Sequence, residues 1–136
     1  MTASAWALWA YILWTLVLVL WITLHRTWLT LAGRRTANSF APDGDDVNPL
    51  YQRITRVHAN CYESFPIYGG ILLLAIAMSA TAITDSLAYY WLAARLAQNL
   101  THLFSTSNLA VSLRFVFMQI QAVIALYWLY LFMGLG

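Results

Sequence analysis

Four polar residues follow one another at helical spacing in an otherwise apolar chain. They are Arg53, Arg56, Asn60 and Glu63, separated by three, four and three positions. At 100° per residue on a helix they fall within an arc of about 80°, so one face presents two guanidinium groups, an amide and a carboxylate. Such a stripe is suited to a small ligand that carries anionic groups and an ammonium. His58 points almost the opposite way and does not belong to this face.

A second polar stripe follows farther along the chain, within an arc of about 100° on a predicted helix. Its members are Arg95, Gln98, Asn99 and His102. Arg114 comes twelve residues after the last of them. Since polar groups in membrane helices are expensive, we expect both stripes and Arg114 to converge on one polar pocket. A guanidinium matches carboxylates bidentately and stays charged when buried, so such a pocket would suit an anionic ligand. The alternative is structural: Arg53 would only hold helices together, and Arg114 would only extend to lipid headgroups.

The composition says which kind of protein must position these residues. Of the 136 residues 62% are hydrophobic and 9% are charged, where a soluble domain carries about 25% charged residues. A chain this small buries only roughly 70% of the surface that it exposes when unfolded, so it cannot hide so much apolar surface from water. The seven basic residues are all Arg, and the net charge is only +2. These values exclude a soluble enzyme, a disordered chain and a nucleic-acid binder, and the single Cys61 excludes a disulfide scaffold or a cysteine-built metal site.

The sequence therefore predicts an all-α integral membrane protein with a single domain over residues 1–136. Four stretches come close to the roughly 20 apolar residues that a helix needs to cross a bilayer: 5–24, 65–83, 87–104 and 115–135. Helices are favoured because an unsatisfied backbone group in lipid costs several kcal/mol. Residues 25–52 form the predicted first loop, and within it 38–49 carry turn-forming residues, including Asp43, Asp45 and Asp46.

The arginines predict an orientation. Five of the seven lie between residues 25 and 63, and basic loops stay on the cytosolic side. The first loop and the short third loop (105–112) are thus expected in the cytosol, with both termini on the other side. The all-Arg, Trp-rich composition favours a bacterial source, and hence the bacterial inner membrane over the endoplasmic reticulum.

The residues of the first stripe also carry a family resemblance. The run from Arg53 to Pro66, RITRVHANCYESFP, resembles the signature of the MAPEG family, the membrane-associated proteins in eicosanoid and glutathione metabolism. That signature reads R-x-x-R-x-H-x-N-x-x-E-x-x-P, and every fixed position is present. Arg95 in the third span and Arg114 at the start of the fourth match a second family feature. The resemblance covers nearly the whole chain.

The resemblance implies a four-helix bundle that assembles as a homotrimer and binds glutathione in clefts between neighbouring subunits. The implied glutathione-binding residues are Arg53, Arg56, Asn60, Glu63, Arg95, Gln98 and His102. Among them Glu63 would take the ammonium group, and His102 replaces a Tyr of some members. An arginine of the pair Arg34–Arg35 would reach a carboxylate from the loop.

The resemblance further implies that Arg114 is the catalytic residue of a glutathione transferase or peroxidase acting on lipophilic electrophiles or lipid peroxides. A guanidinium beside the sulfur lowers the thiol pKa and so produces a nucleophile. Some catalytic members place a Ser directly after this arginine, or a Tyr four residues after it. Here those positions are Phe115 and Met118, which cannot donate a hydrogen bond to sulfur.

That departure keeps a second function open, namely a non-catalytic MAPEG-fold subunit or ligand-binding protein of a larger membrane complex. Two other classes of membrane protein are disfavoured. A small multidrug exporter needs a membrane-embedded carboxylate, whereas Glu63 and Asp85 both lie at span ends. A haem protein would need two facing histidines, and His58 points away from the polar stripe.

Overall fold

The protein is a bundle of four long helices, seen in a computed structural model that describes residues 1–42, 44 and 47–135. The helices are α1 (Ala3–Leu31), α2 (Pro49–Ala77), α3 (Asp85–Phe104) and α4 (Asn108–Met133), and a short 3-10 turn, η1 (Thr81–Ile83), precedes α3. No strand occurs among these described residues. The predicted all-α architecture is confirmed.

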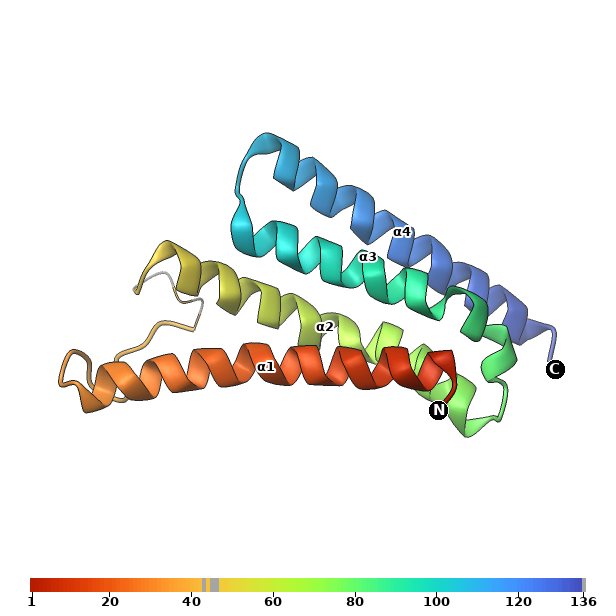
Figure 1. Cartoon of the computed structure of the whole chain (residues 1–136), viewed down its shortest axis with the longest axis horizontal. Helices are drawn as coiled ribbons and strands as arrows, with labels where there is room; N and C mark the ends of the chain where they lie inside the picture. Colours follow the sequence, from red (N-terminus) through yellow and green to blue (C-terminus); the bar gives the residue numbers. More distant parts are fainter. Residues whose placement is uncertain (43, 45–46, 136) are drawn as a thin grey trace.

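The helices run up and down, and consecutive ones pack as antiparallel neighbours (Figure 1). The closest pairs are α1 with α2 and α3 with α4, and α3 also packs on α1. By contrast α2 and α4 scarcely touch each other, because α3 lies between them. The chain termini lie at one end of the bundle, and the α1–α2 connection and the α3–α4 turn lie toward the other.

Side-chain caps fix where three of the helices begin. Thr2 accepts a hydrogen bond from the amide of Ala5, Asn48 from the amide of Tyr51, and Ser107 from the amide of Ala110. Each cap satisfies one of the backbone donors that a helix start leaves without a partner. α2 also has Pro49 in its first turn, where the missing N–H costs nothing.

The helices differ in extent from the predicted spans. α1 continues past residue 24 to Leu31, so the first connection covers 32–48 rather than 25–52. α2 stops at Ala77, short of residue 83, because Ser79 adopts the left-handed conformation that ends a helix. α4 starts at Asn108, since Ser107 caps it, so the third connection spans only 105–107. The three loop aspartates, Asp43, Asp45 and Asp46, lie outside the described residues.

Two of the helices, α1 and α4, are long and apolar enough to cross a membrane by length and composition. α2 and α3 carry the polar stripes and fall short of that measure among the described residues. The shortest of the four, α3, still has 20 residues, about 30 Å at 1.5 Å per residue, which equals the thickness of the hydrocarbon layer.

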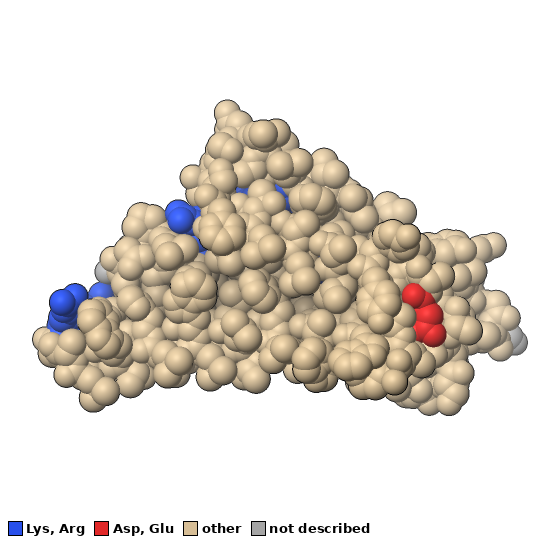
Figure 2. Space-filling model, in the orientation of Figure 1, with Lys and Arg blue, Asp and Glu red and all other residues tan. Residues whose placement is uncertain are grey.

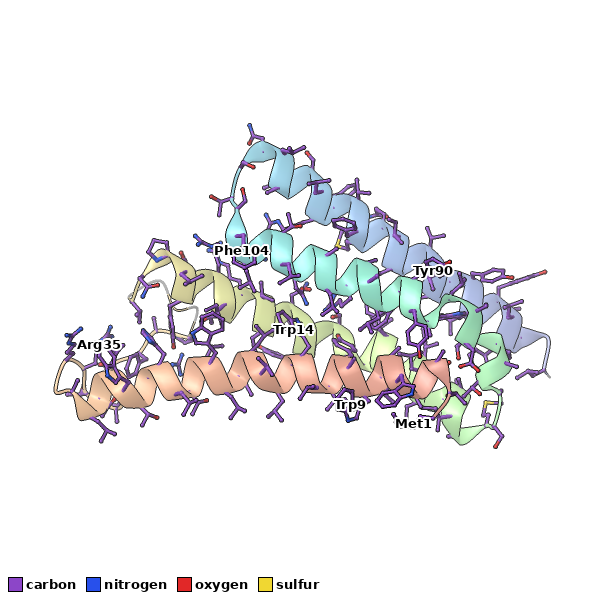
Figure 3. The ribbon with its side chains drawn as sticks, viewed as in Figure 1. Met1, Trp9, Trp14, Arg35, Tyr90 and Phe104 are labelled. Carbon is purple, nitrogen blue, oxygen red and sulfur yellow. The ribbon has the colours of Figure 1, made fainter. Side chains whose placement is uncertain are left out.

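On one face of the bundle the visible basic and acidic groups lie toward opposite ends (Figure 2). On the face seen in Figure 2 the basic side chains lie over the end with the α1–α2 connection and over the α3–α4 half, and the acidic atoms lie near the opposite end. In Figure 3 Arg35 lies at the loop end of the bundle and Met1 at the other end. Both termini thus lie opposite the basic loop, as predicted, whereas the compartment that each end faces stays a prediction.

Candidate functional site

A polar pocket opens between α2, α3 and α4, in the half of the bundle that contains the α3–α4 turn. Its volume is about 440 Å³, within the range of roughly 300–1,000 Å³ that small-molecule sites occupy. The lining side chains are Arg56, Ala59, Asn60, Glu63, Gln98, Asn99, His102, Val111, Arg114, Phe115 and Met118. α2 and α4 make few contacts with each other, which leaves room for the pocket between them.

Six of the eight predicted site residues line this pocket. Three come from the α2 stripe, two from the α3 stripe, and one from α4: Arg56, Asn60, Glu63, Gln98, His102 and Arg114. The expected convergence of two helical stripes and a later arginine is therefore present in the structure. Whether these side chains bind glutathione stays a prediction.

Arg53, the seventh, is turned elsewhere. Its Nε donates a hydrogen bond to the backbone oxygen of Leu103 at 2.8 Å. Leu103 lies in the last turn of α3, where the carbonyl groups have no partner within the helix. The guanidinium of Arg53 thus satisfies a helix end and joins α2 to α3, which is the structural alternative considered for this residue.

Arg95, the eighth, lies in the core of the bundle with an exposed fraction of 2%. Its two terminal nitrogens donate to five oxygens on all four helices: the hydroxyl of Tyr11, the backbone oxygen of Asn60, the hydroxyl of Ser64, and the side-chain oxygens of Gln98 and Gln121. All of these acceptors are neutral. Within the described part of the chain no carboxylate pairs with this guanidinium, so its positive charge is uncompensated behind the pocket wall.

Arg114 lies deeper than predicted. It is the seventh residue of α4 rather than the residue that opens the span, because the helix begins at Asn108. The side chain is half-buried and its Nε has no hydrogen-bond partner among the described residues. Phe115 and Met118 line the pocket beside it, and neither side chain has a hydroxyl group.

The pocket contains both signs of charge without cancelling them internally. Arg56 and Glu63 are exposed, and among the described residues neither forms an ion pair. The side-chain oxygen of Asn60 is buried without a hydrogen-bond partner there. A buried polar atom without a partner is costly, so Asn60 Oδ1 and Arg114 Nε are two unsatisfied atoms on side chains that line the pocket.

An apolar groove adjoins the polar pocket along the outer face of α4. Its volume is about 380 Å³, and Phe115, which also lines the polar pocket, forms one of its walls. The remaining lining residues are Val116, Gln119, Ile120, Val123 and Ile124. A polar cavity and a lipophilic groove therefore meet at one side chain.

The loop arginines lie outside the pocket of this chain. The guanidinium of Arg34 stacks over the ring of Trp28 at 4.8 Å, and that of Arg35 over the ring of Phe40 at 4.9 Å. His58 lies outside the pocket as well, as its position on the helix predicted. Its ring packs beside that of Tyr62 at 5.2 Å, and partial burial lowers its pKa.

Three residues near the site escaped the sequence analysis. Tyr11, Ser64 and Gln121 are the partners of Arg95 on α1, α2 and α4. Gln121 was recognisable as an amide within an apolar span, a placement that demands a hydrogen-bonding partner. Tyr11 gave no such signal, because tyrosines are common in apolar helices.

The fold and the pocket define a class: a helical membrane-protein bundle with a cation-rich site at one end of its helices. The family model described as MAPEG family matches residues 8–134, nearly the whole chain. The chain therefore belongs to the MAPEG family, which confirms the resemblance of its signature segment. Comparison with curated proteins and with solved structures found no match.

Proposed function

We propose that the chain is a glutathione-dependent membrane transferase or peroxidase that acts on lipophilic electrophiles or lipid peroxides. The observation that carries this proposal is the grouping of Arg56, Asn60 and Glu63 with Arg114 in one pocket. Family membership supports a role in glutathione or eicosanoid metabolism at the level of the family.

Glutathione is chemically complementary to the pocket. It carries two carboxylates, one ammonium, two amide groups and a thiol. Arg56 is available to a carboxylate and Glu63 to the ammonium, since neither has an ion-pair partner among the described residues. Asn60 lines the same pocket, and its side-chain amide can both donate to and accept from peptide groups. Charge-assisted bonds of this kind are about twice as strong as neutral ones.

Arg114 is the residue proposed to act on the sulfur. A free thiol has a pKa near 8.5 and is only a few per cent thiolate at neutral pH. A guanidinium next to the sulfur favours the thiolate, and the proton leaves to water at the pocket mouth. The thiolate then forms a carbon–sulfur bond with an electrophile, whose leaving group departs or whose ring opens. With a peroxide it attacks oxygen, which gives an alcohol and a sulfenic acid that a second thiol converts to a disulfide and water.

The apolar groove on α4 supplies a place for the lipophilic partner. It adjoins the polar pocket at Phe115, so a molecule dissolved in the bilayer would reach the sulfur without crossing water. The proposal that the second substrate is lipophilic is supported by Phe115, which lines both the groove and the pocket.

Glutathione binding is tested by isothermal titration into the detergent-solubilised protein. Arg56→Ala and Glu63→Ala are each expected to weaken binding at least tenfold, since a hydrogen bond to a charged group contributes about 1.5–3 kcal/mol. Gln52→Ala, on the same helix but outside the pocket, is the matched control and should leave the affinity unchanged. Absence of saturable binding to the wild type would refute the proposal.

Catalysis is tested with a chlorodinitrobenzene as electrophile and an organic hydroperoxide as oxidant. Arg114→Ala is expected to lower turnover by about 10²–10³, the usual effect of removing one charge-stabilising donor. Arg114→Lys keeps the charge and should retain part of the activity. Unchanged turnover in Arg114→Ala would show that this residue is not catalytic.

A second candidate function rests on the wall beside Arg114. Phe115 and Met118 occupy the positions from which some members donate to sulfur, which favours a non-catalytic ligand-binding subunit of a larger membrane complex. Saturable glutathione binding with no turnover of either substrate would support it. Brisk turnover by the purified protein alone would exclude it.

Assembly and location belong to the same proposal. We place the pocket end in the cytosol, on the inner side of a bacterial membrane, and expect a homotrimer in which a neighbouring copy completes the cleft. The apolar outer face of α4 supports such packing, since Val123 and Leu126 are exposed in the single chain. Crosslinking in native membranes that stops at dimers would contradict the trimer.

A further inference from the structure

A hydrogen-bonded chain of side chains runs from the core of the bundle to the wall of the pocket. It begins at Arg95, passes through Gln121 on α4 and ends at Gln98, which lines the pocket. Gln121 is fully buried, with an exposed fraction of 0%. It does not line the pocket itself, and the chemistry proposed above gives it no role.

The partners of Gln121 fix which end of its amide points where. Its oxygen accepts from Arg95 at 3.2 Å, and an arginine can only donate. Its nitrogen donates to the backbone oxygen of Phe117 at 3.0 Å, and a carbonyl can only accept. Reversing the amide would place like groups against each other at both contacts. Gln121 therefore has one orientation.

That orientation determines the orientation of Gln98. The nitrogen of Gln121 donates to the side-chain oxygen of Gln98 at 2.7 Å, and Arg95 donates to the same oxygen at 3.4 Å. With its oxygen held by two donors, Gln98 must point its NH₂ group the other way. This NH₂ group has no hydrogen-bond partner among the described residues, and Gln98 lies in the pocket wall.

We propose that Gln121 is a positioning residue that, together with Arg95, holds Gln98 as a hydrogen-bond donor and so selects an acceptor group on the ligand. The inference rests on the proposed function in taking glutathione as that ligand. The acceptor is an oxygen of the peptide or its thiolate. The uncompensated charge of Arg95 behind the wall favours an anionic acceptor over a neutral one.

The substitution Gln121→Glu reverses the direction of the hydrogen bond between residues 121 and 98 and leaves the side-chain volume almost unchanged. A carboxylate there pairs with Arg95 and compensates its charge, but it can no longer donate to Gln98. By reversing, Gln98 donates to the new carboxylate at the closer contact (2.7 Å) and gives up the longer bond from Arg95 (3.4 Å), which turns its oxygen toward the pocket. Glutathione affinity should fall at least tenfold, equivalent to about 1.4 kcal/mol. Gln121→Met removes all three hydrogen bonds of Gln121 without adding charge and should have a smaller effect of the same sign.

A double-mutant cycle separates positioning from general structural damage. If Gln121 acts through Gln98, Gln121→Met, which adds no charge beside Arg95, should have little further effect on affinity once Gln98→Met has removed the donor. Titration of glutathione into the wild type, both single variants and the double variant measures this coupling, with circular dichroism as the check on folding. Gln121→Glu, titrated in parallel, shows the added effect of compensating the charge of Arg95.

The outcomes distinguish the two proposals. Wild-type binding with strong coupling between Gln121 and Gln98 supports the inference. Wild-type binding with additive effects, or with Gln121→Glu unchanged, overturns the inference and leaves the proposed function standing. Failure of the wild type to bind glutathione refutes the proposed function and the inference together.

Discussion

Replacing Tyr11 by phenylalanine removes one hydroxyl group from the buried centre of the bundle. Tyr11 is 1% exposed. Its hydroxyl donates to the backbone oxygen of Cys61 at 2.7 Å, lies 3.0 Å from the hydroxyl of Ser64, and accepts from Arg95 at 3.3 Å. The ring contacts survive the change, because phenylalanine still packs against the neighbouring aromatic residues. The experiment thus isolates the hydrogen bonds.

The expected loss follows from which partners find a replacement. Ser64 keeps its bond to the backbone oxygen of Asn60, and Arg95 keeps four other acceptors. The carbonyl of Cys61 loses its closer side-chain donor and keeps the hydroxyl of Ser64 at 3.4 Å, and the guanidinium loses one acceptor. A bond to a charged group contributes about 1.5–3 kcal/mol in proteins generally, whereas bonds between membrane helices average about 0.6 kcal/mol. One charged bond near the lower end of the first range and one average bond between membrane helices are lost. We therefore expect Tyr11→Phe to lower the free energy of unfolding by about 2 kcal/mol.

The assay is unfolding in mixed micelles with increasing denaturing detergent, followed by circular dichroism. Tyr90→Phe is the matched control, because Tyr90 is 69% exposed and its side chain makes no hydrogen bond among the described residues; the control should unfold like the wild type. A Tyr11→Phe variant as stable as this control would refute the assignment of Arg95 and its partners as a stabilising network.

Two further predictions concern the periphery of the bundle. Arg53→Ala removes the bond to Leu103 and should lower the free energy of unfolding by about 1 kcal/mol, since a cation at a helix C-terminus contributes about 0.3–2 kcal/mol. Unfolding in the same micelles measures the loss, and a wild-type midpoint would contradict the capping role. The glycines Gly33 and Gly44 both have a positive φ, but their surroundings differ. An added Cβ at Gly44 would lie 2.8 Å from the ring of Tyr51, whereas one at Gly33 would meet nothing within 4 Å beyond its chain neighbours. Gly33→Ala should therefore cost only the backbone strain of about 1–2 kcal/mol and Gly44→Ala more, and equal losses in the same assay would show that the contact at Gly44 is irrelevant.

The sequence determined the class of protein and one face of its site. An apolar fraction of 62% with 9% charge left only the membrane as solvent, and the absence of water there favours helices. The spacing of Arg56, Asn60 and Glu63 fixed their common face, because a helix imposes 100° per residue whatever surrounds it. All three line the pocket.

Depth along the helix axis was less well determined. Hydropathy locates apolar stretches, but backbone hydrogen bonds decide where a helix starts and stops. The cap at Ser107 moved the start of α4 ahead of the predicted span, and the left-handed Ser79 ended α2 early. For that reason Arg114 is the seventh residue of α4 and not the residue at the start of the helix.

The tertiary structure alone decided what each polar side chain faces. Arg53 and Arg95 share their predicted stripes with pocket residues. Yet Arg53 donates to a carbonyl at the end of α3, and Arg95 donates to side chains in the core, among them Tyr11. Angular position on a helix says nothing of which neighbouring helix offers a partner. In a dry interior a donor without an acceptor is costly, and the acceptors of the two terminal nitrogens of Arg95 come from four helices that only the folded bundle brings together.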